Sequence, residues 1–251
     1  MDMLKDDVLV KALIRYMNEK GQQKKSEEVA CLVSHMDIMG KQHDFFMSDI
    51  KEMKWHLACA IEQYAPVKSS CNKMAIAVGE CARTLHYYLF KNREHIASCA
   101  KTAVAEFDQR RISGLNQAVF TLCSYGPLET TKDKMSEAAD DIGNLIHNIE
   151  AMIQELRTPN SHLRNAGHGT YDKEQIEECA KYLRESQEFL QSAGSTLYCV
   201  NREIGAMMET VHRLELLNKK AERPSVRCRL VSEAPAHALP GPAKRPHEVD
   251  R

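Results

Sequence analysis

Apolar residues recur along most of the chain in alternating steps of three and four, a spacing that places them on one face of an α-helix. Three stretches show this pattern, over residues 29–64, 67–107 and 176–214. Such steps average about 3.5 residues, the coiled-coil period that keeps one apolar stripe, here called a seam, facing a partner helix. The pattern predicts an all-α protein in which long antiparallel helices form a coiled-coil-like bundle.

A shorter amphipathic helix is predicted at the start of the chain. We expect it to run from Asp6 or Asp7 to Lys20, because acidic residues favour a helix N-terminus and Gly21 suits the end of a helix. Its apolar face is expected to consist of Leu9, Leu13 and Tyr16.

Capping residues and prolines predict the other helix boundaries. We expect Ser26 to cap the second helix and Pro127 to end the third. Thr130 or Thr131 is expected to cap the fourth helix, and Asp172 opens the fifth.

The C-terminal part of the chain has a different composition. Five of the eight prolines lie from Pro224 onwards, and no sustained apolar period follows Glu222. Such a segment buries too little surface to offset the entropy of ordering. The predicted organisation is a short N-terminal helix over residues 1–21, a long-helix bundle over 22–221 and a disordered, Pro-rich basic tail over 222–251.

Overall charge and hydropathy exclude some settings for the protein. The 34 basic and 35 acidic residues give a net charge of −1, so no global field attracts nucleic acid or anionic lipid. No apolar run approaches the roughly 18 residues of a membrane span, and the acidic N-terminus does not resemble a signal peptide. We therefore expect a cytoplasmic protein that does not associate with membranes.

The nine cysteines are scattered along the sequence, without a Cys-x-x-Cys pair. Disulfide scaffolds and structural zinc sites normally show tighter, paired spacing. The pattern is typical of reduced thiols in a helical core.

Three stretches of the sequence are distinctive: LKDDVLVKALIRYM at 4–17, RRISGLNQAV at 110–119 and ERPSVRCRL at 222–230. They resemble an uncharacterised all-helical family of unknown function that is carried on bacterial conjugative and other mobile elements. The family has no assigned activity, so the resemblance supplies no functional residues. It implies a cytoplasmic setting and an accessory role in transfer or maintenance of the element.

Few sets of side chains have the spacing that a reaction or a metal ion needs. The sets that share a helical face are Glu209 with His212, Glu52 with His56 and Cys59, and His95 with Cys99. A di-iron bundle needs two Glu-x-x-His units, and each of the other sets needs ligands from further helices. The loop at 160–171 could bind an anion or simply connect two helices. We predict no catalytic residue, no metal ligand and no cofactor.

Other residues are candidates for contacts with a partner or for setting the helix register. Phe45 and Trp55 lie off their seam, which indicates packing against a third helix or contact with a partner. In the tail, Arg223, Val226 and Leu230 are the candidate partner-binding motif.

Three polar residues interrupt the seams: His43, Asn92 and Ser186. A buried polar side chain in a coiled coil can fix register or partner choice at a cost in stability. The alternative is a locally solvated or bent site.

These features favour a non-enzymatic helical interaction, scaffold or accessory protein, such as one encoded by a bacterial mobile element. Its partners would be other proteins or further copies of the chain, bound through the helical seams. One alternative is a nucleic-acid-associated accessory protein that uses the basic tail. The other is a metal-binding helical bundle.

Overall fold

The computed structural model describes residues 3–108, 127–157 and 173–222. The helices are α1 (Val8–Glu19), α2 (Gln23–Gln63), α3 (Lys68–Asp108), α5 (Pro127–Arg157) and α7 (Lys173–Glu222), with short 3-10 helices η1 (Leu4–Asp6) and η2 (Ala65–Val67). These ranges contain no strand, which confirms the all-α class. The predicted tail lies outside the described residues, apart from Glu222.

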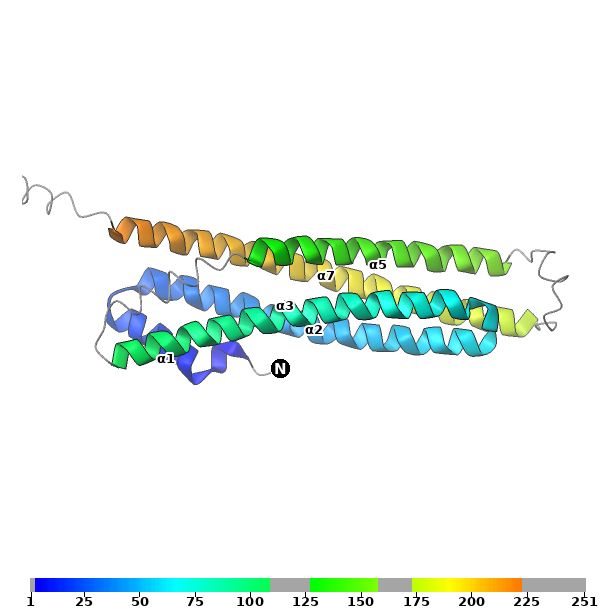
Figure 1. Ribbon diagram of the computed structural model, residues 1–251, viewed down its shortest axis with the longest axis horizontal. Helices are drawn as coiled ribbons and strands as arrows, with labels where there is room; N and C mark the ends of the chain where they lie inside the picture. The colour runs from blue at the N-terminus through cyan, green and yellow to red at the C-terminus, as the bar shows by residue number, and fades with distance from the viewer. Residues whose placement is uncertain (1–2, 109–126, 158–172, 223–251) are drawn as a thin grey trace, which may run out of the picture.

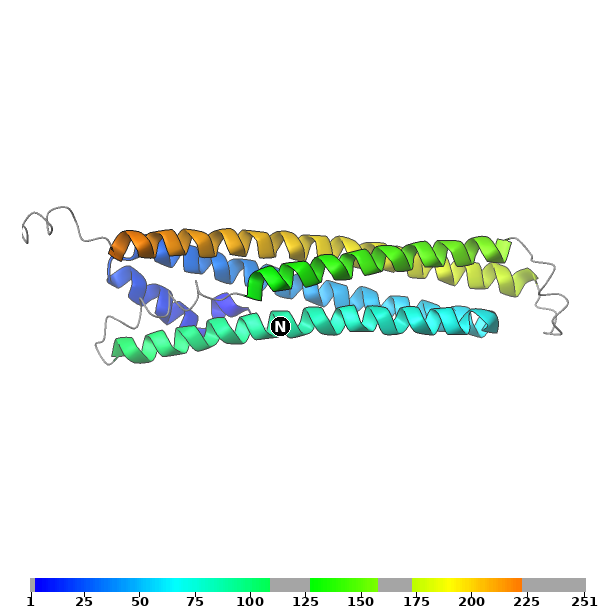
Figure 2. The same cartoon turned by 45° about the horizontal axis from the view of Figure 1, so that its top comes forward.

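The helices form an elongated bundle (Figures 1 and 2). α2 and α3 are antiparallel and joined through η2, while α7 runs along most of the bundle. At 1.5 Å per residue, the 41 residues of α2 span about 60 Å and the 50 residues of α7 about 75 Å. α5 covers only one half of this length, and α1 packs against α2 and α3 in the other half.

The predicted seams form the core. Every residue of the first seam is buried, from Val29 in α2 to Tyr64 just after it, and so are those of the second seam from Val67 in η2 to Ala103 in α3. On α7, Ile176 and Val211 are half-buried and the seam residues between them are buried. Each buried Leu, Ile, Val or Met contributes roughly 1.5–3 kcal/mol of transfer free energy, so this continuous stripe supplies most of the stabilisation.

The first helix begins and ends as the sequence predicts. The Asp7 carboxylate accepts hydrogen bonds from the backbone N–H groups of Leu9 and Val10, and Gly21 follows α1 with a positive φ of 72°. The predicted face is rotated, however, because the fully buried residues are Val10, Leu13 and Met17, whereas Leu9 and Tyr16 are only half-buried.

Two predicted caps are wrong. Ser26 lies inside α2, where its hydroxyl donates a 2.6 Å hydrogen bond to Asn18 Oδ1, so contact with the preceding helix replaces capping. α5 begins at Pro127 rather than at a threonine, and Thr131 is buried within it. Proline is favoured in the first turn of a helix because its missing N–H needs no partner there.

The predicted absence of a membrane span agrees with the hydropathy of the described helices. None of them is both long enough and apolar enough to cross a bilayer.

Asp37 anchors the N-terminal segment to the bundle. Its carboxylate accepts a 2.6 Å hydrogen bond from Leu4 N–H and a 3.0 Å hydrogen bond from Lys5 N–H. Asp37 is buried, and so is the Leu4 side chain that it helps to hold against the core. One carboxylate on α2 therefore satisfies two backbone donors of η1.

Replacing Asp37 with alanine is expected to lower the free energy of unfolding by about 2 kcal/mol, because charge-assisted hydrogen bonds are lost and two backbone donors lose their partner. Urea denaturation measures the change, and limited trypsin digestion should show faster cleavage at Lys5 and Lys11. Glu52→Gln, which alters an exposed carboxylate of the same helix, is the control. Equal stability of the two variants would contradict the anchoring role.

Candidate functional site

A row of polar side chains lies along the flank where α2 meets α7. We call it the α2–α7 polar row, and it consists of Glu28, Cys31 and His35 of α2 with Arg202, Glu203, Thr210 and Arg213 of α7. Its members on α2 are three or four residues apart, so they share one helical face. Each side chain of the row contacts the next, in an unbroken series that begins at Glu28 and ends at Arg202.

The centre of the row brings a thiol, an imidazole and a carboxylate together. Cys31 Sγ lies 3.5 Å from His35 Nε2, and His35 Nδ1 lies 2.7 Å from Glu203 Oε2. Cys31 is partly exposed, the His35 side chain is 21% exposed and the Glu203 side chain is 8% exposed. This order of groups is that of a nucleophile, its base and the group that orients the base.

Glu203 is a carboxylate in this arrangement. Burial alone would raise its pKa, but hydrogen bonds from His35 and Arg202 outweigh burial and leave the pKa below its ordinary value. Arg202 donates from both Nε and Nη2 to Glu203 Oε1, at 3.3 and 3.0 Å. Because an ionised carboxylate can only accept, His35 Nδ1 carries a proton and donates it to Glu203.

The other end of the row supports the sulfur. Thr210 Oγ1 lies 3.9 Å from Cys31 Sγ and 2.9 Å from the backbone oxygen of Ala206. Arg213 Nη2 donates to Thr210 Oγ1 at 3.0 Å, and Arg213 Nε lies 2.8 and 2.9 Å from the two carboxylate oxygens of Glu28. Thr210 is fully buried, so its hydroxyl is held in place between the two helices.

The other described cysteines have different surroundings. Burial raises the pKa of Cys71 and Cys81 to about 11 and that of Cys179 to about 12. Cys59 is partly exposed like Cys31, but burial and then Glu62 raise its pKa. Among the described cysteines, only Cys31 combines partial exposure with a hydrogen bond to a histidine.

The sequence contained only part of the signal for this site. Cys31 and His35 are four residues apart on one predicted helix, a spacing that allows contact. Glu203 is 168 positions from His35 and has no local signature. The polar row was therefore missed by sequence reasoning.

His43, the first polar seam residue, is buried against α3. Its Nε2 lies 3.3 Å from Nδ1 of His86, which stacks on Phe90, and its Nδ1 lies 3.4 Å from Asp44 Oδ1. Burial is the main cause of a lowered pKa at His43; the nearby His86 lowers it further, while Asp44 opposes the change. A contact between two histidines therefore joins α2 and α3, and burial favours the neutral form of His43.

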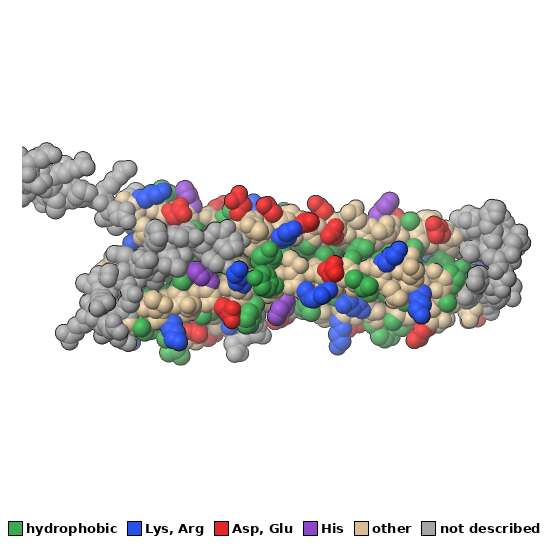
Figure 3. Space-filling model, viewed as in Figure 1, with side chains coloured by type: hydrophobic (Ala, Val, Ile, Leu, Met, Phe, Trp, Pro, Cys, Tyr) green, Lys and Arg blue, Asp and Glu red, His purple; other side chains and the backbone are tan. Residues whose placement is uncertain are grey.

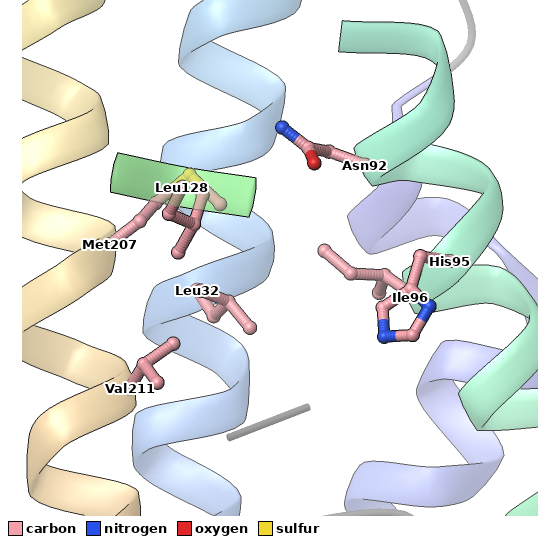
Figure 4. Close-up of a pocket in the computed structure, with 7 residues that line it drawn as sticks. All are labelled: Leu32, Asn92, His95, Ile96, Leu128, Met207 and Val211. Atoms are coloured by element: carbon pink, nitrogen blue, oxygen red, sulfur yellow. The ribbon is translucent and has the colours of Figure 1, made fainter. Parts of the chain in front are cut away.

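Asn92, the second polar seam residue, borders a cavity of about 260 Å³, a volume that includes solvent at its open side. Figure 4 shows residues of four helices around it, with Asn92, His95 and Ile96 from α3 and Leu128 from α5. Leu32 of α2 and Met207 and Val211 of α7 complete the lining. Asn92 is 2% exposed, and neither its Oδ1 nor its Nδ2 bonds to any described group.

Ser186, the third polar seam residue, is satisfied within its own helix. It is fully buried, and its hydroxyl donates to the backbone oxygen of Tyr182 at 2.9 Å. This bond removes the cost of an unpaired hydroxyl, and Ser186 makes no polar contact with another of the described helices.

The two aromatic residues off the α2 seam are exposed. Phe45 is 64% exposed and Trp55 is 56% exposed. The Trp55 ring also meets Tyr182 of α7 edge to face, with centroids 6.2 Å apart, so contact with another helix accounts for part of its surface. The tail candidates Arg223, Val226 and Leu230 lie outside the described residues, as does the loop at 160–171.

The sets of side chains considered as metal ligands are not part of a larger group of ligands among the described residues. Within the described ranges, no three His, Cys, Asp or Glu side chains are placed to hold a metal ion. His95 Nε2 does approach Cys99 Sγ, at 3.6 Å. His56 Nδ1 instead lies 2.9 Å from Glu185 Oε2 of α7, an ion-pair distance without hydrogen-bond geometry.

Charges of both signs are mixed over the surface. The face shown in Figure 3 carries both basic and acidic side chains, with apolar side chains between them. This face therefore carries no extended patch of one sign, in keeping with a net charge of −1.

The fold defines the class of protein as an elongated bundle of long α-helices. A model of a family of unknown function, DUF6674, matches residues 6–249, and the chain belongs to this family. Comparison with curated proteins and with solved structures gave no match.

Replacing Asn92 with leucine is expected to raise the free energy of unfolding by about 1–3 kcal/mol, because a buried amide without a partner is removed and the adjacent cavity is filled. Thermal and urea denaturation measure the change. Asn201→Leu is the control: its Oδ1 is also buried without a partner among the described groups, but its Nδ2 donates to Ser136 Oγ at 2.7 Å, and the loss of this bond should be destabilising. Destabilisation by Asn92→Leu would contradict this expectation.

His43 is expected to make stability depend on pH. Because its pKa is lowered in the folded state from 6.5, the unfolded chain binds more protons below that pH, and stability falls as the pH decreases through the lowered value. His43→Leu should therefore lose less free energy of unfolding than the wild type between about pH 7 and pH 5. His147→Gln, at a side chain 83% exposed, should leave the pH dependence unchanged. The same slope in His43→Leu as in the wild type would count against this role.

Proposed function

We propose that this chain is a non-enzymatic helical interaction protein, a scaffold or accessory factor that binds another protein through aromatic side chains on its outer surface. The observation that supports the proposal most directly is the exposure of Phe45 and Trp55, at 64% and 56%. Aromatic residues are enriched at protein interfaces, and they supply much of the binding energy there.

The seams themselves are occupied within the chain. Phe46, Leu57 and Leu197 are at most 1% exposed, as are many other seam residues. A partner that meets the closed bundle therefore contacts its outer surface. Burying one large apolar side chain there contributes roughly 1.5–3 kcal/mol before the costs of association.

The setting of this interaction is part of the proposal. The three stretches that resemble proteins of bacterial mobile elements support a cytoplasmic accessory role in transfer or maintenance of such an element. A role in binding nucleic acid would depend on the basic residues of 222–251, and the mixed charges in Figure 3 give it no further support. Protein binding is therefore the function that we favour.

The double variant Phe45→Ser/Trp55→Ser is expected to lose its protein partner while it keeps its fold, because both side chains are largely exposed. Quantitative cross-linking in the native host, followed by mass spectrometry, identifies proteins joined to the wild type and measures their loss. Tyr198→Ser is the matched control, since Tyr198 is 73% exposed but lies on α7. A defined partner lost only from the double variant supports the proposal. Equal cross-linking of all three chains, or no cross-linked protein at all, would overturn it.

A further inference from the structure

The α2–α7 polar row contains a thiol whose neighbours are arranged for chemistry that the proposed function does not use. We propose that Cys31 is a reactive thiol that forms a mixed disulfide with low-molecular-weight disulfides, with His35 as its base and Glu203 as the group that orients His35. The site is a modification site, and it requires no enzymatic turnover.

The tautomer of His35 follows from its partners. Glu203 is ionised and accepts the Nδ1 proton across 2.7 Å. In the neutral ring, Nε2 then has a free lone pair, and this atom faces Cys31 Sγ at 3.5 Å. His35 is therefore placed to take the Cys31 proton, and Glu203 stabilises the imidazolium that results.

The reaction balances without a further reagent. The Cys31 S–H proton passes to His35 Nε2, and the thiolate attacks one sulfur of the small disulfide. The S–S bond of that disulfide breaks as the new S–S bond forms, and the departing thiolate takes the proton from His35. The products are a mixed disulfide on Cys31 and one free thiol, so the small disulfide is the oxidant.

Both helices that meet at the site contribute charged groups. Beside His35, Arg202 donates to Glu203 and compensates part of its charge. On the far side of Cys31, Glu28 is paired with Arg213, which also donates to Thr210. The Thr210 hydroxyl donates its one proton to the backbone oxygen of Ala206 at 2.9 Å. Because this hydroxyl lies 3.9 Å from Cys31 Sγ, it can rotate to donate to the sulfur when Cys31 becomes negative.

Two cysteines of the chain serve as internal controls. Cys59 is also partly exposed on α2, but its pKa is raised by burial and by Glu62. Cys99 also contacts a histidine four residues away, at 3.6 Å, but it is 6% exposed. Reactivity at Cys31 alone would therefore depend on exposure together with the His35–Glu203 pair.

The test uses the full, reduced chain and 2-hydroxyethyl disulfide, a neutral probe that the neighbouring arginines do not attract. Peptide mass spectrometry follows the rate of modification at each cysteine. At about pH 7, Cys31 is expected to react about tenfold faster than Cys59, and Cys99 should remain unmodified. His35→Gln should lower the Cys31 rate about tenfold, and Glu203→Gln should lower it less, with no change at Cys59.

The pH profile separates the action of a base from a structural effect. Without His35, the Cys31 rate should rise steeply between about pH 7 and pH 9, as it does for an unassisted thiol, whereas the wild-type rate should rise less. If a variant opens the bundle, the buried Cys71 becomes reactive in the same experiment. In that case, the ratio of the modification rate at Cys31 to that at Cys59 in the wild type, together with the wild-type pH profile, decides whether Cys31 is a reactive thiol. Equal rates at Cys31 and Cys59, or a Cys31 rate and pH profile that His35→Gln leaves unchanged in a closed bundle, would overturn the proposal.

Discussion

Burial of apolar residues spaced three and four apart is the constraint on which the rest of this structure depends. Long helices in water owe most of their stability to tertiary packing of an amphipathic face. Here the seams of α2, α3 and α7 share one core with the buried residues of α5, and α1 closes the half of the bundle that α5 does not reach. This packing decides which helices are neighbours. Most polar groups near the core then find a partner on an adjacent helix or within their own turn, as Ser186 does, whereas the Asn92 amide finds none among the described residues.

The polar contacts between α2 and α7 follow from that packing and in turn define its register. Successive residues along α2 meet successively earlier residues along α7: Glu28 with Arg213, Cys31 with Thr210, His35 with Glu203 and His56 with Glu185. The exposed Arg213 pair contributes little stability by itself. Sliding one helix by a turn, however, would separate every pair and remove the His35 hydrogen bond from the buried Glu203, which would keep only Arg202 of its own helix as a partner. The seam supplies stability, and the polar row makes one register preferable to its neighbours.

The parts of the fold that could be predicted are those whose cause lies within one helix. The three-four period is repeated along each seam, so the cores of α2, α3 and α7 follow from the sequence, as does the cap at Asp7. Ser26 was misassigned because its hydroxyl bonds to Asn18 of the preceding helix, a contact that no capping pattern contains. The pairs His35–Glu203 and His43–His86 depend on helix neighbours and register. A single sequence does not contain that information, so less of the candidate site than of the fold could be predicted.

The packing that makes the bundle stable also decides which thiols can react. Cys71, Cys81 and Cys179 lie in the core, and burial raises their pKa to about 11 or 12, so their thiolates are scarce near neutral pH. A nearby histidine does not change this by itself, because Cys99 lies as close to His95 as Cys31 does to His35 and is still buried on its seam. Cys31 differs in lying beside the seam, between Val29 and Leu32, on the flank that faces α7. There the second helix supplies a carboxylate for the histidine and a hydroxyl for the sulfur. A bundle of this kind can therefore keep its core thiols inert while a thiol beside the seam, such as Cys31, stays accessible.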